Sequence, residues 1–191
     1  MVTIWKCLVQ PKLDYYSQLW TPSDQESINC IEGVQYNFFS KVAGCDQLDH
    51  WQLLQQLHLY SQERRRERYV VIFLWKIAEG LVRGYSVDFK SDSIENSRRG
   101  RLAQSKPYIR SAPAAVRRAR ESSLHVKGCR LFNLLPPQLR NMSGCSVEIF
   151  KKELDYFLAT VPDQPTAPDL TRAASTNSLI DQLAMMVGSR N

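Results

Sequence analysis

Residues 61–81 predict the longest helix of this 191-residue chain and constrain its fold more than any other feature. The first half of this stretch is dense in charge, whereas the second half is apolar on most sides. Gly80 and Gly84 are positions at which the helix can end, because glycine accepts the left-handed backbone that commonly follows a helix. A helix of this length favours a mostly α fold.

Apolar residues before this helix also recur at helical spacing. Residues 8–20 predict a helix bent at Pro11, because proline lacks a backbone N–H. Ser23, followed by Glu26, forms a capping-box pattern that opens a helix running to about Val42. A short amphipathic helix is expected over residues 48–59. For the capped helix, the expected core side is Ile28, Ile31, Val34, Phe38 and Val42, and the expected solvent side is Gln25, Glu26, Asn29, Glu32 and Lys41.

Beyond residue 121 the apolar residues form two groups. The first group is broken by Gly128 and ended by two prolines, and a short helix is expected to begin at Pro137. Ser146 then caps a helix over residues 147–158, whose apolar residues share one face. After residue 162 the composition is typical of a mobile tail, with a terminal helix over residues 179–187 as the alternative.

The intervening stretch has a different composition. Residues 90–120 are rich in serine, arginine, alanine and glycine and show little apolar periodicity, with Leu102 and Tyr108 in candidate strands. We therefore expect a basic connector with weak β character. The expected organisation is a helical domain over residues 1–84, the connector over 85–121, a C-terminal unit over 122–162 and a mobile tail over 163–191.

Positive charge is concentrated in that connector. The chain carries a net charge of +6, yet residues 98–120 alone contain eight basic residues and no acidic one. Such a segment points to a polyanion, with nucleic acid as the first candidate, held through its backbone and by occasional base stacking. A second basic cluster begins the 61–81 helix, where arginine forks suit phosphate oxygens. The candidate nucleic-acid-binding residues are Arg64, Arg65, Arg66, Arg68, Arg98, Arg99, Arg101, Lys106, Tyr108, Arg110, Arg117, Arg118 and Arg120.

Both basic regions also have a simpler interpretation. The arginines of the 61–81 helix can form a solvated first turn, with Glu63 and Glu67 as partners at helical spacing. The connector can equally be a solvated loop without any partner. The sequence alone leaves these alternatives open.

Catalysis and metal binding have no matching pattern in this sequence. No Cys-x-x-Cys pair occurs, so the five cysteines are expected to be free thiols rather than zinc ligands. No adjacent pair of aspartates is available to hold magnesium against phosphate, and glycine-rich phosphate loops are absent. We therefore expect no enzymatic activity from this chain alone, no metal and no cofactor.

The sequence carries no signal for a membrane or for export. No run of about 18 apolar residues occurs, so no membrane partner is expected. No charged-then-apolar leader precedes Ile4, so we expect an intracellular protein, with nucleus and cytoplasm both open.

Five stretches together resemble one protein family. They are Leu-Val-Gln-Pro-Lys-Leu-Asp-Tyr-Tyr-Ser-Gln-Leu-Trp at residues 8–20, residues 31–35, residues 57–65, the Arg-Leu-Phe-Asn-Leu-Leu-Pro run at 130–136, and residues 147–155. Their order and spacing resemble the region after the polymerase core in reverse transcriptases of non-LTR (LINE-type) retrotransposons. The resemblance covers about residues 4–165.

The resemblance implies a thumb-like helical domain over residues 1–84 and the family's C-terminal region after it. Family members are RNA-directed DNA polymerases, and their thumb grips a template–primer duplex. Their paired catalytic aspartates precede the first matched stretch, so no catalytic residue is carried over. The implied function is that of a non-catalytic fragment or remnant that binds an RNA/DNA duplex weakly and non-specifically, with a separate polymerase core as a further partner.

Several alternatives to this implication stay open. The chain can be a helical protein-interaction or structural module with no nucleic-acid role, or a translated fragment without function. Whether it is a truncated gene model, a decayed copy or a repurposed protein also stays open. A remnant is expected to leave apolar residues such as Ile4, Leu8 or Trp20 exposed, where a larger enzyme once covered them.

Overall fold

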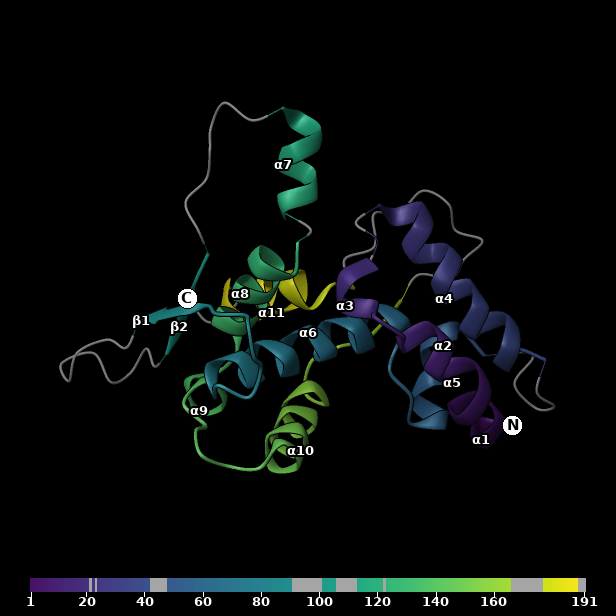
Figure 1. Ribbon diagram of the computed structural model, residues 1–191. Helices are drawn as coiled ribbons and strands as arrows, with labels where there is room; N and C mark the ends of the chain where they lie inside the picture. The colour runs from purple at the N-terminus through teal and green to yellow at the C-terminus, as the bar shows by residue number, and fades with distance from the viewer. Residues whose placement is uncertain are drawn as a thin grey trace. The chain divides into compact units, whose positions relative to one another are not determined.

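The computed structural model describes residues 1–20, 22, 24–41, 48–90, 101–105, 113–121, 123–165 and 177–188 (Figure 1). It is mostly helical, which confirms the expected fold class. The chain forms two compact units: unit 1 comprises residues 1–67 and 162–182, and unit 2 comprises residues 68–161 and 183–191. This division differs from the expected one, because the boundary lies within the long helix and the segment after residue 162 is shared between the units.

Unit 1 begins with an almost continuous helical segment. It consists of α1 (Val2–Ile4), the π-helix η1 (Trp5–Val9) and α2 (Gln10–Asp14), and α3 (Ser17–Trp20) follows after a turn. Pro11 does not interrupt this segment. Pro11 lies in the first turn of α2, directly after the wider π-helical turn, where its missing N–H is tolerated. The break comes instead at Tyr16, whose φ is +48°.

Helix α4 (Gln25–Phe39) is capped by Asp24, one residue after the expected Ser23. The Asp24 carboxylate accepts a hydrogen bond from the Ser27 N–H at 2.8 Å. The expected inner face of α4 is partly wrong. Glu32 is buried, whereas Val34 is 42% exposed, so a polar side of the helix faces inward.

The core of unit 1 is built around Trp5, Phe39 and Leu53. Phe39 comes from α4, and Leu53 comes from α5 (His50–Leu57), which an Asp49–Gln52 capping box begins. The Trp5 ring centroid lies 5.2 Å from that of Phe39. Val2, Val9 and Leu13 complete the apolar contacts, so the N-terminal segment, α4 and α5 pack together (Figure 1).

Helix α6 (Gln62–Ala78) confirms the longest predicted helix. Gly80, with φ of +70°, ends it as expected. The Leu81 N–H donates to the Lys76 carbonyl at 2.9 Å and the Gly80 N–H donates to the Ile77 carbonyl at 3.0 Å, which is the Schellman pattern. The boundary between the two units lies between Glu67 and Arg68 of this helix.

In unit 2, α8 (Leu124–Leu134) packs on the apolar half of α6. The sequence suggested that Gly128 breaks this segment, but the helix continues through it. A Cβ at Gly128 would lie 3.4 Å from Val70 Cγ1 and 3.6 Å from a Leu74 methyl, so glycine lets the two helices approach closely. Leu131 and Phe132 are fully buried on the same side.

Two short strands extend this core. Strand β1 (Asp88–Lys90) pairs antiparallel with β2 (Leu102–Gln104), and Phe89 lies opposite Ala103. Asn133 of α8 continues the ladder: its amide accepts from the Ala103 N–H at 2.8 Å and donates to the Ala103 carbonyl at 2.9 Å. This pairing gives the Asn of the 130–136 motif a structural role. Leu102 is in a strand as expected, whereas Tyr108 lies outside the described residues.

The last elements of unit 2 largely match expectation. Helix α9 (Pro137–Arg140) begins at the second proline, and α10 (Val147–Leu158) has the predicted bounds. Ser146 caps α10 by accepting from the Ile149 N–H at 3.3 Å. The Phe150 ring of α10 stacks on Trp75 of α6 at 4.5 Å between centroids.

Two helices occupy segments expected to be irregular. Helix α7 (Ala114–Glu121) lies within the predicted connector, where its alanines give little apolar periodicity. Helix α11 (Leu179–Gly188) lies within the predicted mobile tail, so the terminal-helix alternative is the correct one for this segment. In unit 1 the buried Glu67 carboxylate accepts from the Leu179 N–H at 2.6 Å and from the Ser178 hydroxyl at 2.9 Å.

Candidate nucleic-acid interface

The arginines that begin α6 serve the fold instead of facing solvent. Arg64 is fully buried, and its Nη2 donates to the Pro162 carbonyl at 2.7 Å. Arg65 forms a two-pronged ion pair with Asp14, with Nη2 to Oδ2 at 2.8 Å and Nε to Oδ1 at 3.0 Å. Both arginines therefore tie α6 to other segments of unit 1 and are not displayed as a phosphate-binding surface.

Arg66 and Arg68 have comparable roles. Arg66 is buried, with its guanidinium carbon 4.3 Å from the centre of the Trp20 ring. Arg68, the only one of the four in unit 2, pairs with Asp155 through Nε at 2.5 Å and Nη2 at 2.7 Å. The four arginines were expected either to form a nucleic-acid surface or to be a solvated first turn. Both expectations are wrong, because carboxylates and carbonyls of the fold engage this cluster.

A buried polar layer lies beside Arg66 in unit 1. Glu32 of α4 accepts a hydrogen bond from the Glu63 N–H at 2.7 Å, so its carboxylate caps the first turn of α6. Burial raises the pKa of Glu32 to about 7, although hydrogen bonds to backbone N–H groups and the Arg66 charge act in the opposite direction. Burial lowers the pKa of His50 to about 4, against the opposing influence of Asp163. The layer explains why α4 turns polar residues inward.

The second predicted basic region is only partly described. Arg98, Arg99, Lys106, Tyr108 and Arg110 lie outside the described residues, as does the side chain of Arg118. The remaining members of this region are Arg101, Arg117 and Arg120.

Arg101 is another structural residue. Its Nη1 pairs with the Glu79 carboxylate at 2.8 Å, and its Nη2 and Nε donate to the Met142 and Arg140 carbonyls at 2.7 and 2.8 Å. The guanidinium thereby joins the end of α6 to the segment around α9. The expectation that Arg101 contacts nucleic acid is therefore corrected: its guanidinium is used within the fold.

After these structural arginines are set aside, the basic residues of α7 and α8 remain as candidates for contact with nucleic acid. Arg117 of α7 is exposed, and Arg120 is partly buried. In α8, Arg130 is exposed and Lys127 is partly buried. Neither Arg117 nor Arg130 has an ion pair with any residue that the structure describes. Residues 113–130 contain five basic residues and one acid, Glu121. We call the basic residues of these two consecutive helices, which Figure 1 shows as ribbons, the basic surface of unit 2.

Two members of this surface, Lys127 and Arg130, were not among the predicted residues. Glu121, the first acid after the basic stretch 98–120, separates them from it in the sequence. Recognition of α8 as one helix through Gly128 would have added both, since they are three positions apart on one helical face.

Unit 1 carries exposed apolar residues on its N-terminal segment. Ile4 is 48% exposed, Leu8 is 64% exposed and Trp20 is 43% exposed. These are the residues for which a remnant was expected to show exposure. Inward contacts of the N-terminal segment are made by other residues, namely Val2, Trp5, Val9 and Leu13.

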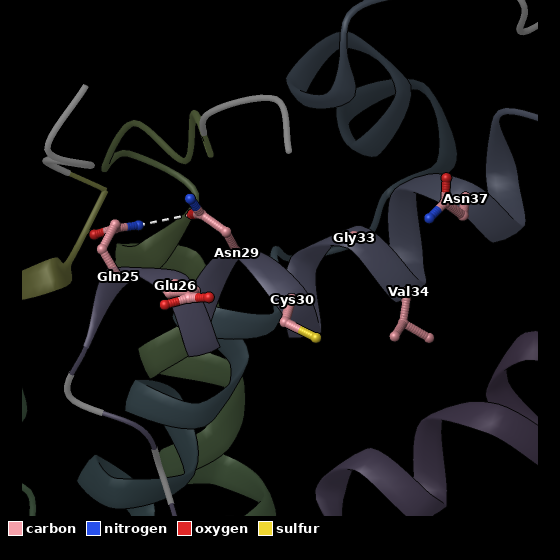
Figure 2. A pocket seen from close by; sticks show the side chains of 7 residues that line it. All are labelled: Gln25, Glu26, Asn29, Cys30, Gly33, Val34 and Asn37. Carbon is pink, nitrogen blue, oxygen red and sulfur yellow. Dashed lines mark hydrogen bonds between the residues drawn. The ribbon is translucent and has the colours of Figure 1, made fainter. Parts of the chain in front are cut away.

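A hollow of about 840 Å³ also lies along the outer face of α4 (Figure 2). Its lining residues are Gln25, Glu26, Asn29, Cys30, Gly33, Val34 and Asn37. Gln25 is held by the side chain of Asn29, to which it donates at 2.8 Å. The lining holds one carboxylate and one thiol and does not pair a nucleophile with a base. It offers no chemistry beyond ordinary surface contacts.

The described residues contain no group of three or more histidine, cysteine, aspartate or glutamate side chains that could hold a metal ion. Within the same residues, no helix has the length and apolar character needed to cross a membrane. A scan against family models and searches of curated proteins and of solved structures find no match to this chain.

Proposed function

We propose that this chain is a non-catalytic helical module that holds nucleic acid through the basic surface of α7 and α8 and, apart from Arg101, the basic residues at 98–110 that precede them. The ligand is an RNA/DNA duplex of the template–primer type, bound weakly and without sequence preference through its phosphates. Arginine and lysine neutralise phosphates and release counterions, which gives a strong and sequence-independent contribution to affinity.

The observation that carries this proposal is the exposure of α7. Its alanines and Val116 are exposed, as is Arg117, so this helix contributes little to the core of unit 2. A helix of eight residues is not stable by itself in water. A short, basic and poorly packed helix is well suited to be completed by a polyanion that covers its arginines.

The origin that we propose is the thumb and C-terminal region of a non-LTR reverse transcriptase. Two observations support it. Apolar residues of the first matched stretch are exposed, as expected for a part of a larger enzyme. The Asn of the 130–136 motif binds both backbone groups of Ala103, a role that accounts for asparagine at this position.

A salt titration tests the proposal. Binding of the full chain to a fluorescently labelled RNA–DNA hybrid duplex is measured by anisotropy at several salt concentrations. We expect the logarithm of the affinity to fall linearly with the logarithm of salt concentration. Replacing both Arg117 and Arg130 by glutamine should weaken binding about tenfold at low salt and reduce the slope by roughly 2.

The matched control replaces Arg83 and Lys152 by glutamine. Both residues are exposed in unit 2 and lie outside α7 and α8, so the control removes the same charge. The proposal fails if the chain does not bind at low salt, if affinity is independent of salt, or if the control variant loses as much affinity as the Arg117/Arg130 variant.

A further inference from the structure

The N-terminal segment of unit 1 is apolar on two sides. Its inner row, Val2, Trp5, Val9 and Leu13, packs on the core of the unit. Its outer row, Ile4, Cys7, Leu8, Pro11 and Tyr15, is exposed along its whole length. Members of the outer row are spaced by three and four residues, so they follow one face of the helical segment. We call this row the outer stripe.

A helix that is apolar on two sides is typical of a helix covered on both. The outer stripe includes large side chains, with Leu8 64% and Tyr15 70% exposed. Beyond it, Leu19 of α3 is 74% exposed. Contiguous exposed apolar surface of this kind marks an interaction site, whereas single exposed apolar residues do not.

Trp20 gives the stripe a rigid aromatic end. Its Nε1 donates to the Tyr15 carbonyl at 2.6 Å, and one face of its ring lies over the Arg66 guanidinium. The ring is thus held in place while part of it stays exposed. Tyrosine, tryptophan and arginine are the residue types that dominate binding energy at protein interfaces.

The charges beside the stripe indicate the chemistry of the partner. Residues 1–20 contain three charged side chains, Lys6, Lys12 and Asp14. Both lysines are exposed, whereas Asp14 is engaged by Arg65. Lys12 lies four residues after Leu8 and three before Tyr15, so a positive charge borders the stripe. Two copies of this chain placed face to face would bring lysines against lysines, which is unfavourable.

We infer that the outer stripe binds a helix of a different protein, one that presents an apolar row flanked by glutamates or aspartates. The stripe from Ile4 to Tyr15 spans about three helical turns, which suits a short helix lying along it. The partner's carboxylates then face Lys12. A contact of this size is expected to be weak and transient. The site belongs to unit 1, whereas the proposed nucleic-acid surface belongs to unit 2.

The test uses two synthetic helical peptides with the same leucine row, one flanked by glutamates and the other by lysines. Their binding to the full chain is measured by fluorescence anisotropy. We expect the glutamate peptide to bind at least tenfold more tightly than the lysine peptide. Leu8→Asp should weaken binding of the glutamate peptide at least tenfold, while the control Leu81→Asp should leave it unchanged. Leu81 is also exposed but lies in unit 2.

A charge reversal gives the decisive result. In the Lys6→Glu/Lys12→Glu variant the preference should invert, so that the lysine peptide binds more tightly. The inference is overturned if both peptides bind equally, or if the reversal leaves the preference unchanged. It is also overturned if sedimentation shows a dimer of this chain that Leu8→Asp abolishes, because a second copy would then be the occupant. Circular dichroism establishes that each variant is folded, and the Leu8→Asp variant should keep the duplex affinity of the original chain.

Discussion

Two groups of arginines in this protein have the same side-chain chemistry and opposite surroundings. At the start of α6, Arg64 is fully buried and Arg65 is paired with Asp14. On α7 and α8, Arg117 and Arg130 are exposed. A cluster of positive charge in a sequence therefore does not indicate a binding surface by itself. The position of the carboxylates and carbonyls that receive the guanidinium groups decides between a structural and a binding role.

Replacement of Arg64 should have the largest effect on stability. Arg64→Ala removes a buried side chain that donates to the Pro162 carbonyl, and it leaves that carbonyl and a cavity behind. We expect the free energy of unfolding to fall by roughly 3–5 kcal/mol. Arg117→Ala, the matched control on α7, should change it by less than about 0.5 kcal/mol. Denaturation in urea measures both values.

The same two variants test whether the arginines of α6 and those of α7 and α8 differ in their role. Duplex affinity should be reduced by Arg117→Ala, and not by Arg64→Ala at temperatures where that variant is folded. If Arg64→Ala is as stable as the original chain and loses duplex affinity, then the α6 cluster belongs to the binding surface.

The polar layer that Arg66 joins should produce two opposing pH dependences. Glu32 has a pKa of about 7 when folded and 4.5 as a free side chain, so its contribution to stability falls as pH rises between these values. His50 has a pKa of about 4 when folded and 6.5 as a free side chain, so its contribution falls as pH drops through this range. Each contribution amounts to roughly 2–3 kcal/mol between about pH 4.5 and 6.5.

We therefore expect the stability of the original chain to change little over this range, because the two contributions cancel. Glu32→Gln should make the protein lose stability on acidification, and His50→Gln should make it gain stability on acidification. Urea denaturation at a series of pH values measures this. Parallel pH profiles for the two variants would show that the layer is open to water, and the contrast between buried and exposed charge would then be weaker than the structure indicates.

Predictions from the sequence succeed where one segment determines its own structure. Ser146 begins α10 and Gly80 ends α6, because a capping hydroxyl and a left-handed glycine act on backbone groups a few residues away. The inner face of α4 could not be predicted in this way. Glu32 is buried because it caps α6, which begins 30 residues later in the chain.

The candidate site shows the same limit more clearly. The partners of the α6 arginines, Asp14 and Asp155, are 51 and 87 residues away in the sequence. Local spacing suggested Glu63 and Glu67 as partners and gave no sign that the Glu67 carboxylate also accepts hydrogen bonds from Ser178 and Leu179, more than 100 residues away. Arg117 on α7 is exposed, and among the described residues no carboxylate forms an ion pair with it.

The Arg68–Asp155 pair of unit 2 should give the smallest effect and the finest test of the comparison. The Arg68 side chain is mostly buried, whereas Asp155 is more than one-third exposed, so solvent screens the pair. Asp155→Asn should lower the free energy of unfolding by about 1 kcal/mol or less. Duplex affinity should not change, because the Arg68 guanidinium stays within the fold. Urea denaturation and the anisotropy titration are compared with Glu148→Gln, an exposed acid of the same helix. A larger gain in duplex affinity for Asp155→Asn than for this control would show that Arg68 reaches nucleic acid once it is released, and would place it with Arg117 and Arg130.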